Sequence, residues 1–340
     1  MRNRDWRRRR KPKVVGRRKT RRRQEQNCAT LHARVLKNLR RAQVRFASME
    51  SILRFFHRRP EYRTATLLTG SLFWLVGFFL LPLAYLLAVS FARRSPYGTI
   101  DWTLGFANYA RAFQPLYLQV YWRSFWMALV TTTLCALLGF PVAYTLALRV
   151  STRWKSVLLM LVVIPFWTSF LIRTYAWMII LRSEGVVNNT LLALHLIHEP
   201  LRLLYTPMAV MIGLVYGELP FMILPLYAVL QKLDPTLLEA AEDLGAPWWR
   251  AFLRVTLPLS SPGLVAGSIL VFIASVGAFV TPDLLGGART MMVGNLIQNQ
   301  FAVARDQPFG SAVAFLLTFV VLALVAAGLR KSENTTGEMF

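Results

Sequence analysis

The sequence predicts an all-α integral membrane protein with six transmembrane helices. Of its 340 residues, 55% are hydrophobic and only 16% are charged, whereas a soluble domain carries about a quarter charged residues. The apolar residues gather into long runs separated by shorter polar segments. About 20 apolar residues in a helix cross a bilayer, because each residue adds about 1.5 Å against a core about 30 Å thick.

Six runs reach or nearly reach this length, and they contain almost no charge. Four of them have no charged residue, the third has only Arg173, and the fourth has only Glu218. Backbone groups in lipid must bond internally, and a helix achieves this within one segment. The prolines within the runs are compatible with kinked helices that surround a pathway, and equally with ordinary packing between membrane helices. The predicted crossings are residues 64–92, 124–148, 156–181, 203–230, 259–282 and 307–329.

The distribution of basic residues between the loops predicts the orientation. With six crossings, both termini lie on one side, together with the loops at 149–155 and 231–258. That side carries a densely basic N-terminal segment, and we place it in the cytoplasm because short cytoplasmic loops are rich in Lys and Arg. The opposite side also has basic residues, which weakens the contrast without reversing it: Arg93, Arg94, Arg111 and Arg123.

The loop between the fourth and fifth crossings reads EAAEDLGAPWWRAFLRVTLP at 239–258. Asp234 is a good N-cap and Pro235 suits a first helical position, so a short helix begins there. Gly245 ends it as a left-handed cap. Pro247 starts a second short helix, which Pro258 ends. Two amphipathic helices on the cytoplasmic face fit either an interfacial elbow or a docking knob for a partner.

The order of residues in this loop resembles the EAA loop of binding-protein-dependent ABC importer permeases. The resemblance covers roughly residues 62–330. Over this range the chain is similar to spermidine/putrescine-type permeases, in particular to the first of their two permease subunits. Val255 replaces the usual Ile of the loop. Further matching segments are less specific than the loop itself. The loop matches are Glu239, Ala240, Ala241, Gly245, Leu257 and Pro258, and the further segments are PFWTSFLIRTYAW at 165–177, LPFMILPLY at 219–227, DLGA at 243–246 and TPDLLGG at 281–287.

The resemblance implies a type I importer permease fold, in which the loop is a coupling helix that docks on an ATPase subunit. It implies a second homologous permease, an ATP-binding-cassette ATPase dimer, an extracytoplasmic binding protein and the lipid of a bacterial inner membrane as partners. A polyamine is the expected substrate, and opine-like compounds and phosphonates are the alternative substrates. The alternative classes of protein are a secondary transporter and a non-transporting membrane scaffold. The expected docking residues are Glu239, Ala240, Ala241, Asp243, Gly245, Leu257 and Pro258.

No residue pattern in the chain predicts catalysis. A phosphate-binding P-loop needs a Lys after Gly, and none of the seven Lys follows a glycine. We therefore expect no enzyme activity and no cofactor in this chain, with ATP and magnesium on the partner ATPase. His195, His198 and Glu199 lack the spacing of a zinc helix and are expected in a solvated external loop without metal.

Glu218 and Arg173 are ionisable residues inside membrane runs, where charges are costly and usually face a cavity or the protein interior. Glu218 falls near mid-depth and is a candidate contact for a cationic substrate. A structural pair with Arg173, or a position near an interhelical carbonyl, is the equal alternative. Trp167, Tyr175 and Trp177 offer cation–π faces, although membrane aromatics are more often packing or interface residues.

The domain boundaries follow the charge. Residues 1–63 hold 23 Lys and Arg against four acidic residues. We expect a disordered basic extension at 1–60, a permease domain at 61–330 and a short tail at 331–340. The basic extension is expected to bind anionic lipid, because this attraction contributes about 1 kcal/mol per basic residue near the membrane surface. We do not expect a nucleic-acid partner. An alternative is that translation begins at Met49.

Overall fold

The computed structural model describes residues 60–96 and 98–337. The chain divides into two compact units, residues 1–82 and 83–340. In the first unit the described part is the beginning of α2 (Pro60–Ser90), and the end of that helix belongs to the second unit. Met49 and nearly all of the expected basic extension at 1–60 lie outside the described residues.

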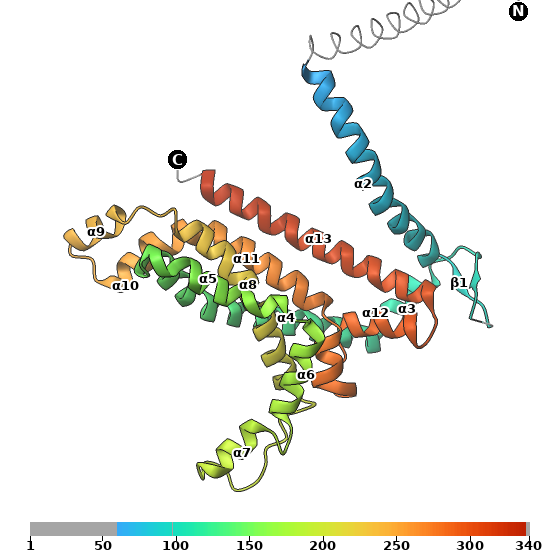
Figure 1. Cartoon of the computed structure of the whole chain (residues 1–340). Coiled ribbons are helices and arrows are strands. Elements are labelled where there is room, and N and C mark those ends of the chain that lie inside the picture. Colours follow the sequence, from blue (N-terminus) through green and yellow to red (C-terminus); the bar gives the residue numbers. More distant parts are fainter. Residues whose placement is uncertain (1–59, 97, 338–340) are drawn as a thin grey trace, which may run out of the picture. The chain divides into compact units, whose positions relative to one another are not determined.

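The second unit is helical apart from one short hairpin. Its strands, β1 (Arg93–Arg94) and β2 (Ile100–Asp101), pair antiparallel. Three π-helical segments and one 3-10 segment interrupt or join the described α-helices (Figure 1). The remaining elements are α3 (Ala107–Ala112), α4 (Pro115–Tyr144), η1 (Thr145–Arg149), α5 (Thr152–Trp167), α6 (Phe170–Leu181), α7 (Val186–Ala193), α8 (Pro207–Leu230), α9 (Thr236–Asp243), α10 (Trp248–Ala251), η2 (Phe252–Thr256), α11 (Leu257–Gly277), η3 (Pro282–Gly286), η4 (Gly287–Thr290), α12 (Val293–Ala302) and α13 (Gln307–Gly337).

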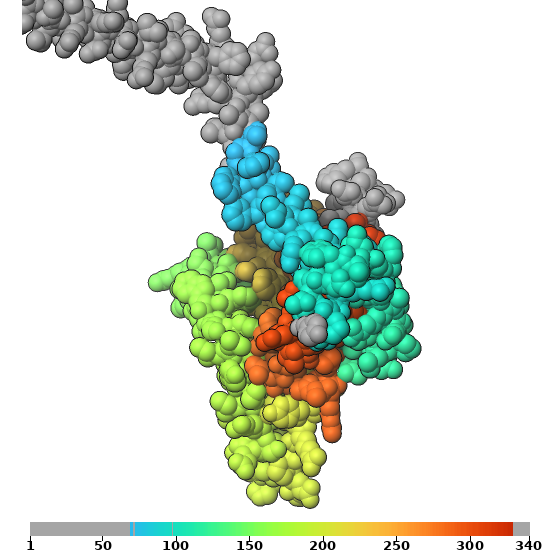
Figure 2. Space-filling view, turned by 90° about the vertical axis from the view of Figure 1, so that its right-hand side faces the viewer, coloured from blue at the N-terminus to red at the C-terminus, as the bar shows by residue number. Residues whose placement is uncertain are grey.

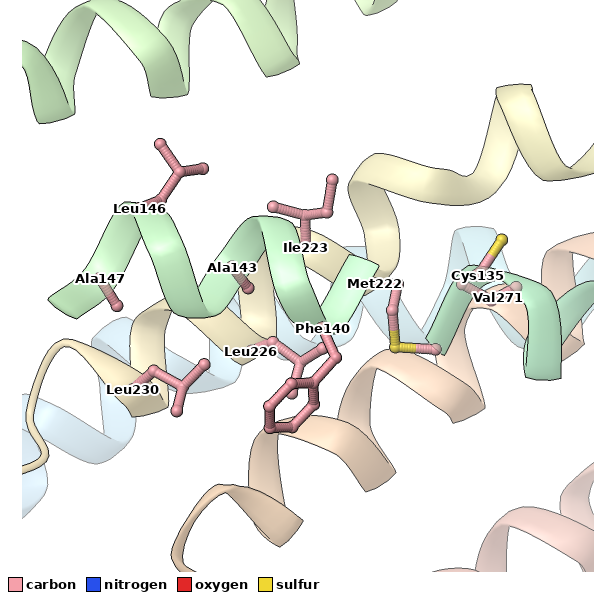
Figure 3. Packing of buried hydrophobic residues seen from close by; sticks show 10 residues of the cluster. All are labelled: Cys135, Phe140, Ala143, Leu146, Ala147, Met222, Ile223, Leu226, Leu230 and Val271. Atoms are coloured by element: carbon pink, nitrogen blue, oxygen red, sulfur yellow. The ribbon is translucent and has the colours of Figure 1, made fainter. Parts of the chain in front are cut away.

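Helices α4, α8 and α11 pack against one another and form the core of this unit. Figure 3 shows side chains of α4 and α8 converging, with Phe140, Met222 and Leu226 near the centre of the cluster. Small residues allow the backbones to approach closely, as is common between membrane helices. A Cβ added at Gly263 of α11 would lie 2.9 Å from the carbonyl oxygen of Pro225 in α8.

Five helical segments among the described residues are long and apolar enough to cross a membrane, and the number is six if one bent pair of helices is counted as a single span. The bent pair is the predicted third crossing, and the expectation of one continuous helix over 156–181 is wrong. Helix α5 ends at Trp167, Thr168 is extended with ψ 147°, and the chain turns by 90° into α6. The Thr168 hydroxyl donates a hydrogen bond of 2.7 Å to the carbonyl of Pro165 and so caps part of the end of α5.

The expectation that Pro258 ends a short helix is also wrong. Helix α10 continues through η2 into α11, so residues 248–277 form one helical span. Pro258 has no amide hydrogen for the carbonyl of Arg254, which would break a regular α-helix. Arg254 lies in the π turn η2, and such one-turn bulges allow a helix to continue past an irregularity.

The ends of the last two crossings also differ from those predicted. Helix α11 stops at Gly277, before the predicted end at residue 282. Helix α13 continues to Gly337, so most of the tail expected at 331–340 is helical.

An ion pair connects α3 to the beginning of α13. Arg111 donates a hydrogen bond of 2.7 Å from Nη1 to Asp306, whose side chain is 5% exposed. The guanidinium lies 4.1 Å from the ring centroid of Phe309, and Asp306 also accepts the Phe309 amide. Burial disfavours the charge, but hydrogen bonds, chiefly to Asp306, outweigh it and hold the pKa of Arg111 above its ordinary value. Figure 2 shows the teal surface that includes α3 beside the orange-red surface of α12 and α13.

Replacement of Gly263 by Leu should destabilise the packing of α8 against α11, because the new side chain meets the α8 backbone at once. We expect a loss of about 1–3 kcal/mol in stability, the usual cost of overpacking. Thermal unfolding of the purified protein in detergent measures the effect. Gly277→Leu is the matched control, because nothing lies within 4 Å of a Cβ at that position. Equal melting temperatures for the two variants would contradict the assigned packing.

Candidate functional site

The first part of the motif at 239–258 lies on the short helix α9, which is closed by a glycine turn. Asp234 accepts the amide of Thr236 at 3.0 Å, so it caps the helix, which begins one residue later than predicted. Gly245 has φ +76°, as expected for a left-handed cap. Its amide donates to the carbonyl of Glu242, and the amide of the next residue donates to the carbonyl of Ala241. These two bonds make a Schellman motif, which fixes the direction in which the chain leaves α9.

The two halves of the motif differ in exposure. None of the residues of α9 is buried, and Glu239, Ala240 and Asp243 are exposed. Leu244, which completes the expected apolar face, is 89% exposed. Leu257, by contrast, packs against the core cluster of α4, α8 and α11. The first half of the motif is therefore exposed in this chain, whereas Leu257 in the second half packs on the helical core.

Glu218 on α8 and Arg173 on α6 do not pair directly. Within the described residues they form neither an ion pair nor a hydrogen bond with each other. Glu218 Oε2 and the Nε and Nη1 atoms of Arg173 are buried and have no hydrogen-bond partner. The expected alternative of a direct structural pair is therefore absent here. Buried polar atoms are nearly always hydrogen-bonded in proteins, so these three atoms distinguish this region from the rest of the helical core.

Arg173 lies between the two halves of the broken crossing. Its guanidinium carbon is 5.1 Å from the ring centroid of Phe166 on α5 and 5.9 Å from that of Phe170 on α6. The Phe166 ring also meets the edge of Phe221, at 5.1 Å between centroids. Phe221 follows Glu218 by three residues on α8 and so lies within one helical turn of it. The break, Arg173 and this turn of α8 therefore meet at one place.

The three aromatic candidates occupy different surroundings. Trp177 meets the edge of Tyr216 on α8 at 5.5 Å and packs against a buried cluster. Trp167 is 78% exposed and Tyr175 is also exposed. Neither of these two makes a ring contact with another described residue. The structure thus brings Trp177 towards α8, whereas Trp167 stands at the break.

Sequence reasoning missed the break and the two phenylalanines beside Arg173. A signal was present, because Pro165 is followed by the polar pair Thr168 and Ser169 within an otherwise apolar run. Proline weakens a helix, and a Ser or Thr side chain competes for backbone hydrogen bonds. Together they favour an end of one helix and the beginning of the next.

Replacement of Gly245 by Ala should loosen the turn after α9, because a side chain at φ +76° is strained by about 1 kcal/mol or more. Hydrogen exchange of the amides of residues 245 and 246 measures the effect, and faster exchange is expected. Gly245→Asn should restore part of the protection, since Asn tolerates the left-handed region. Unchanged exchange in the Ala variant would contradict the assigned cap.

The chain is similar to known transport proteins. The family described as "Binding-protein-dependent transport system inner membrane component" matches residues 136–332. The spermidine/putrescine transport system permease protein PotB of Haemophilus influenzae is 44% identical over 260 residues, covering 76% of this chain and 91% of that protein. PotB of Escherichia coli strain K12 is 44% identical over 260 residues, covering 76% of this chain and 94% of that protein.

The fold is also similar to that of a solved transporter. One chain of a bacterial ABC transporter involved in the import of the acidic polysaccharide alginate matches with a TM-score of 0.65. The match covers 83% of this chain and 98% of that chain at 20% identity, so it bears on the fold alone. The chain is therefore a multi-pass inner membrane protein with the fold of an ABC importer permease, and it belongs to the family of inner membrane components of binding-protein-dependent transport systems.

Proposed function

We propose that this chain is a permease subunit of an ATP-driven importer that carries polyamines such as spermidine and putrescine. The observation that carries the substrate assignment is 44% identity, over three quarters of the chain, to proteins named for spermidine/putrescine transport. Glu218 supports it, because a carboxyl group with one buried oxygen, Oε2, that has no hydrogen-bond partner in this chain suits a cationic solute. The chain itself has no P-loop, so a separate subunit hydrolyses ATP.

Helix α9 is the proposed contact with that ATPase. This short helix has no buried side chains, and it carries Glu239, Ala240, Ala241 and Asp243. The left-handed turn at Gly245 sets the angle between α9 and the chain that follows. Helix α9 contacts η2, and η2 is continuous with α11, which packs on α8 and α4. A force applied to α9 would therefore reach the helical core through a short, continuous path.

The positive residues near α9 support a cytoplasmic position for this loop. Lys155 donates a hydrogen bond to the carbonyl of Ala147, Lys232 follows the end of α8, and Arg250 lies over the ring of Trp249. We therefore place the loops at 149–155 and 231–258, together with both termini, in the cytoplasm. A second homologous permease, two ATPase subunits and an extracytoplasmic binding protein would complete the importer.

The break between α5 and α6 indicates which face borders the pathway. Irregular backbone at membrane depth is tolerated only inside protein or beside a water-filled cavity. Trp167, Thr168 and Ser169 are exposed in the isolated chain. This face must consequently be covered by the second permease or by the translocation pathway, and not by lipid. Glu218 and Arg173 belong to the same region.

ATP-dependent uptake by the purified complex in proteoliposomes tests this function. The partner binding protein delivers each test compound, which is a polyamine, an opine-like compound or a phosphonate. We expect the complex to take up the polyamines only. Uptake that persists without the ATPase would indicate a secondary transporter. Failure of any ATPase to co-purify with the chain would favour a scaffold. Either result would reject the proposal.

Charge reversal at Glu239 should uncouple ATP hydrolysis from uptake. A lysine on this exposed face of α9 removes a negative charge from the proposed docking surface, and we expect uptake to fall by at least about tenfold, the scale of losing one charge partner at an interface. Membrane insertion should be unchanged, because Glu239 is not buried. Glu199→Lys, on an exposed loop at the opposite end, is the control. Normal uptake per ATP in the Glu239 variant would remove α9 from the coupling mechanism.

A further inference from the structure

The end of α5 at the break offers unbonded backbone oxygens. The last four carbonyl groups of a helix have no partner within it. Here the Thr168 hydroxyl bonds the carbonyl of Pro165 at 2.7 Å, and no described amide donates to the carbonyls of Ile164, Phe166 or Trp167. The C-terminal end of a helix carries a partial negative charge. This end is therefore an attractive place for a cation.

A cation from the chain itself lies there. The Arg173 guanidinium rests against the rings of Phe166 and Phe170, and its buried Nε and Nη1 atoms have no hydrogen-bond acceptor. An arginine that serves as a structural ion pair would normally use its planar fork to bind a carboxylate. Arg173 makes no such bond among the described residues, so its described contacts are those with the two ring faces.

An unsatisfied anion completes the arrangement. Glu218 Oε2 is buried without a donor, and the Phe221 ring one turn further along α8 contacts Phe166. A carboxylate, an aromatic face and open carbonyl oxygens are the groups that recognise an alkylammonium ion. An ammonium group brings three donors, binds a ring face by cation–π attraction, and can satisfy oxygens that a guanidinium in this position does not reach.

We propose that the α5–α6 break and Glu218 form a binding site for an organic ammonium group, and that Arg173 occupies this site when substrate is absent. The inference rests on the proposed function and adds to it the identity of the site and its resting occupant. Substrate would displace Arg173 from the rings of Phe166 and Phe170. Because these two rings belong to the two halves of the broken crossing, displacement would also release the contact that spans the break.

The test is equilibrium binding of radiolabelled 1,4-diaminobutane to the purified importer complex in detergent, without the binding protein. Arg173→Gln removes the internal competitor, so we expect roughly tenfold tighter binding, equivalent to about 1.4 kcal/mol. Glu218→Gln should bind at least about tenfold more weakly. Arg182→Gln and Glu184→Gln are matched controls, because both side chains are exposed just after α6. They should bind as the unaltered complex does.

Two further measurements separate this site from a structural role for Arg173. Arg173→Lys keeps a tethered cation, so this variant should not bind 1,4-diaminobutane more tightly than the unaltered complex does. In the second measurement, 1-aminobutane should compete with the labelled diamine less well than unlabelled diamine does. The inference is overturned if Arg173→Gln shows no gain in affinity or no detectable binding, or if Glu218→Gln binds normally. ATP-dependent uptake by the unaltered complex is measured in parallel. If uptake is intact, only the site is rejected, whereas absence of polyamine uptake rejects the proposed function itself.

Discussion

The structure depends on one constraint, which is that backbone amides and carbonyls within a bilayer must find partners inside the protein. Five crossings meet it as continuous helices, even where prolines interrupt the bonding. The π turns η1 and η2 lie close to Pro141 and Pro258, and the Thr145 hydroxyl donates to the carbonyl of Pro141 at 2.8 Å. Local adjustments of this kind preserve the long helices, and the long helices in turn supply the packed core of α4, α8 and α11.

The third crossing departs from this pattern, and the departure coincides with the two ionisable residues that have buried, unpaired side-chain atoms. Its break leaves carbonyl groups open beside Arg173, and α8 brings Glu218 to the same neighbourhood. Each of these features would be costly against lipid. Their occurrence together has a simple physical explanation if this face never meets lipid, because polar backbone, charged side chains and a hydrated solute then share one environment.

The sequence was sufficient for features that depend on local composition. Runs of apolar residues predicted where helices occur, and Gly245 predicted a left-handed turn. Apolar counts did not predict the turn at Thr168, because they are the same for a straight helix and for a bent one. The local signal was the polar pair Thr168 and Ser169 after Pro165. Pro258 was misjudged because a widened turn two residues earlier lets the helix continue. The contact of Arg111 with Asp306 joins residues 195 positions apart, which no local pattern reveals.

Helix α9 and the break lie on different parts of one helical framework, which constrains how they can influence each other. Continuity through η2 and α11 makes transmission from α9 to α8 physically reasonable, but coupling also requires an element with two discrete arrangements. The packed helices of the core are poorer candidates, because a second arrangement would require many close contacts to repack at once. The α5–α6 junction is a better one, because ring contacts with a single guanidinium span it and no backbone hydrogen bond is seen to cross it. A solute that binds one arrangement of this junction more tightly than the other would shift its population, and the framework would carry that shift to α9.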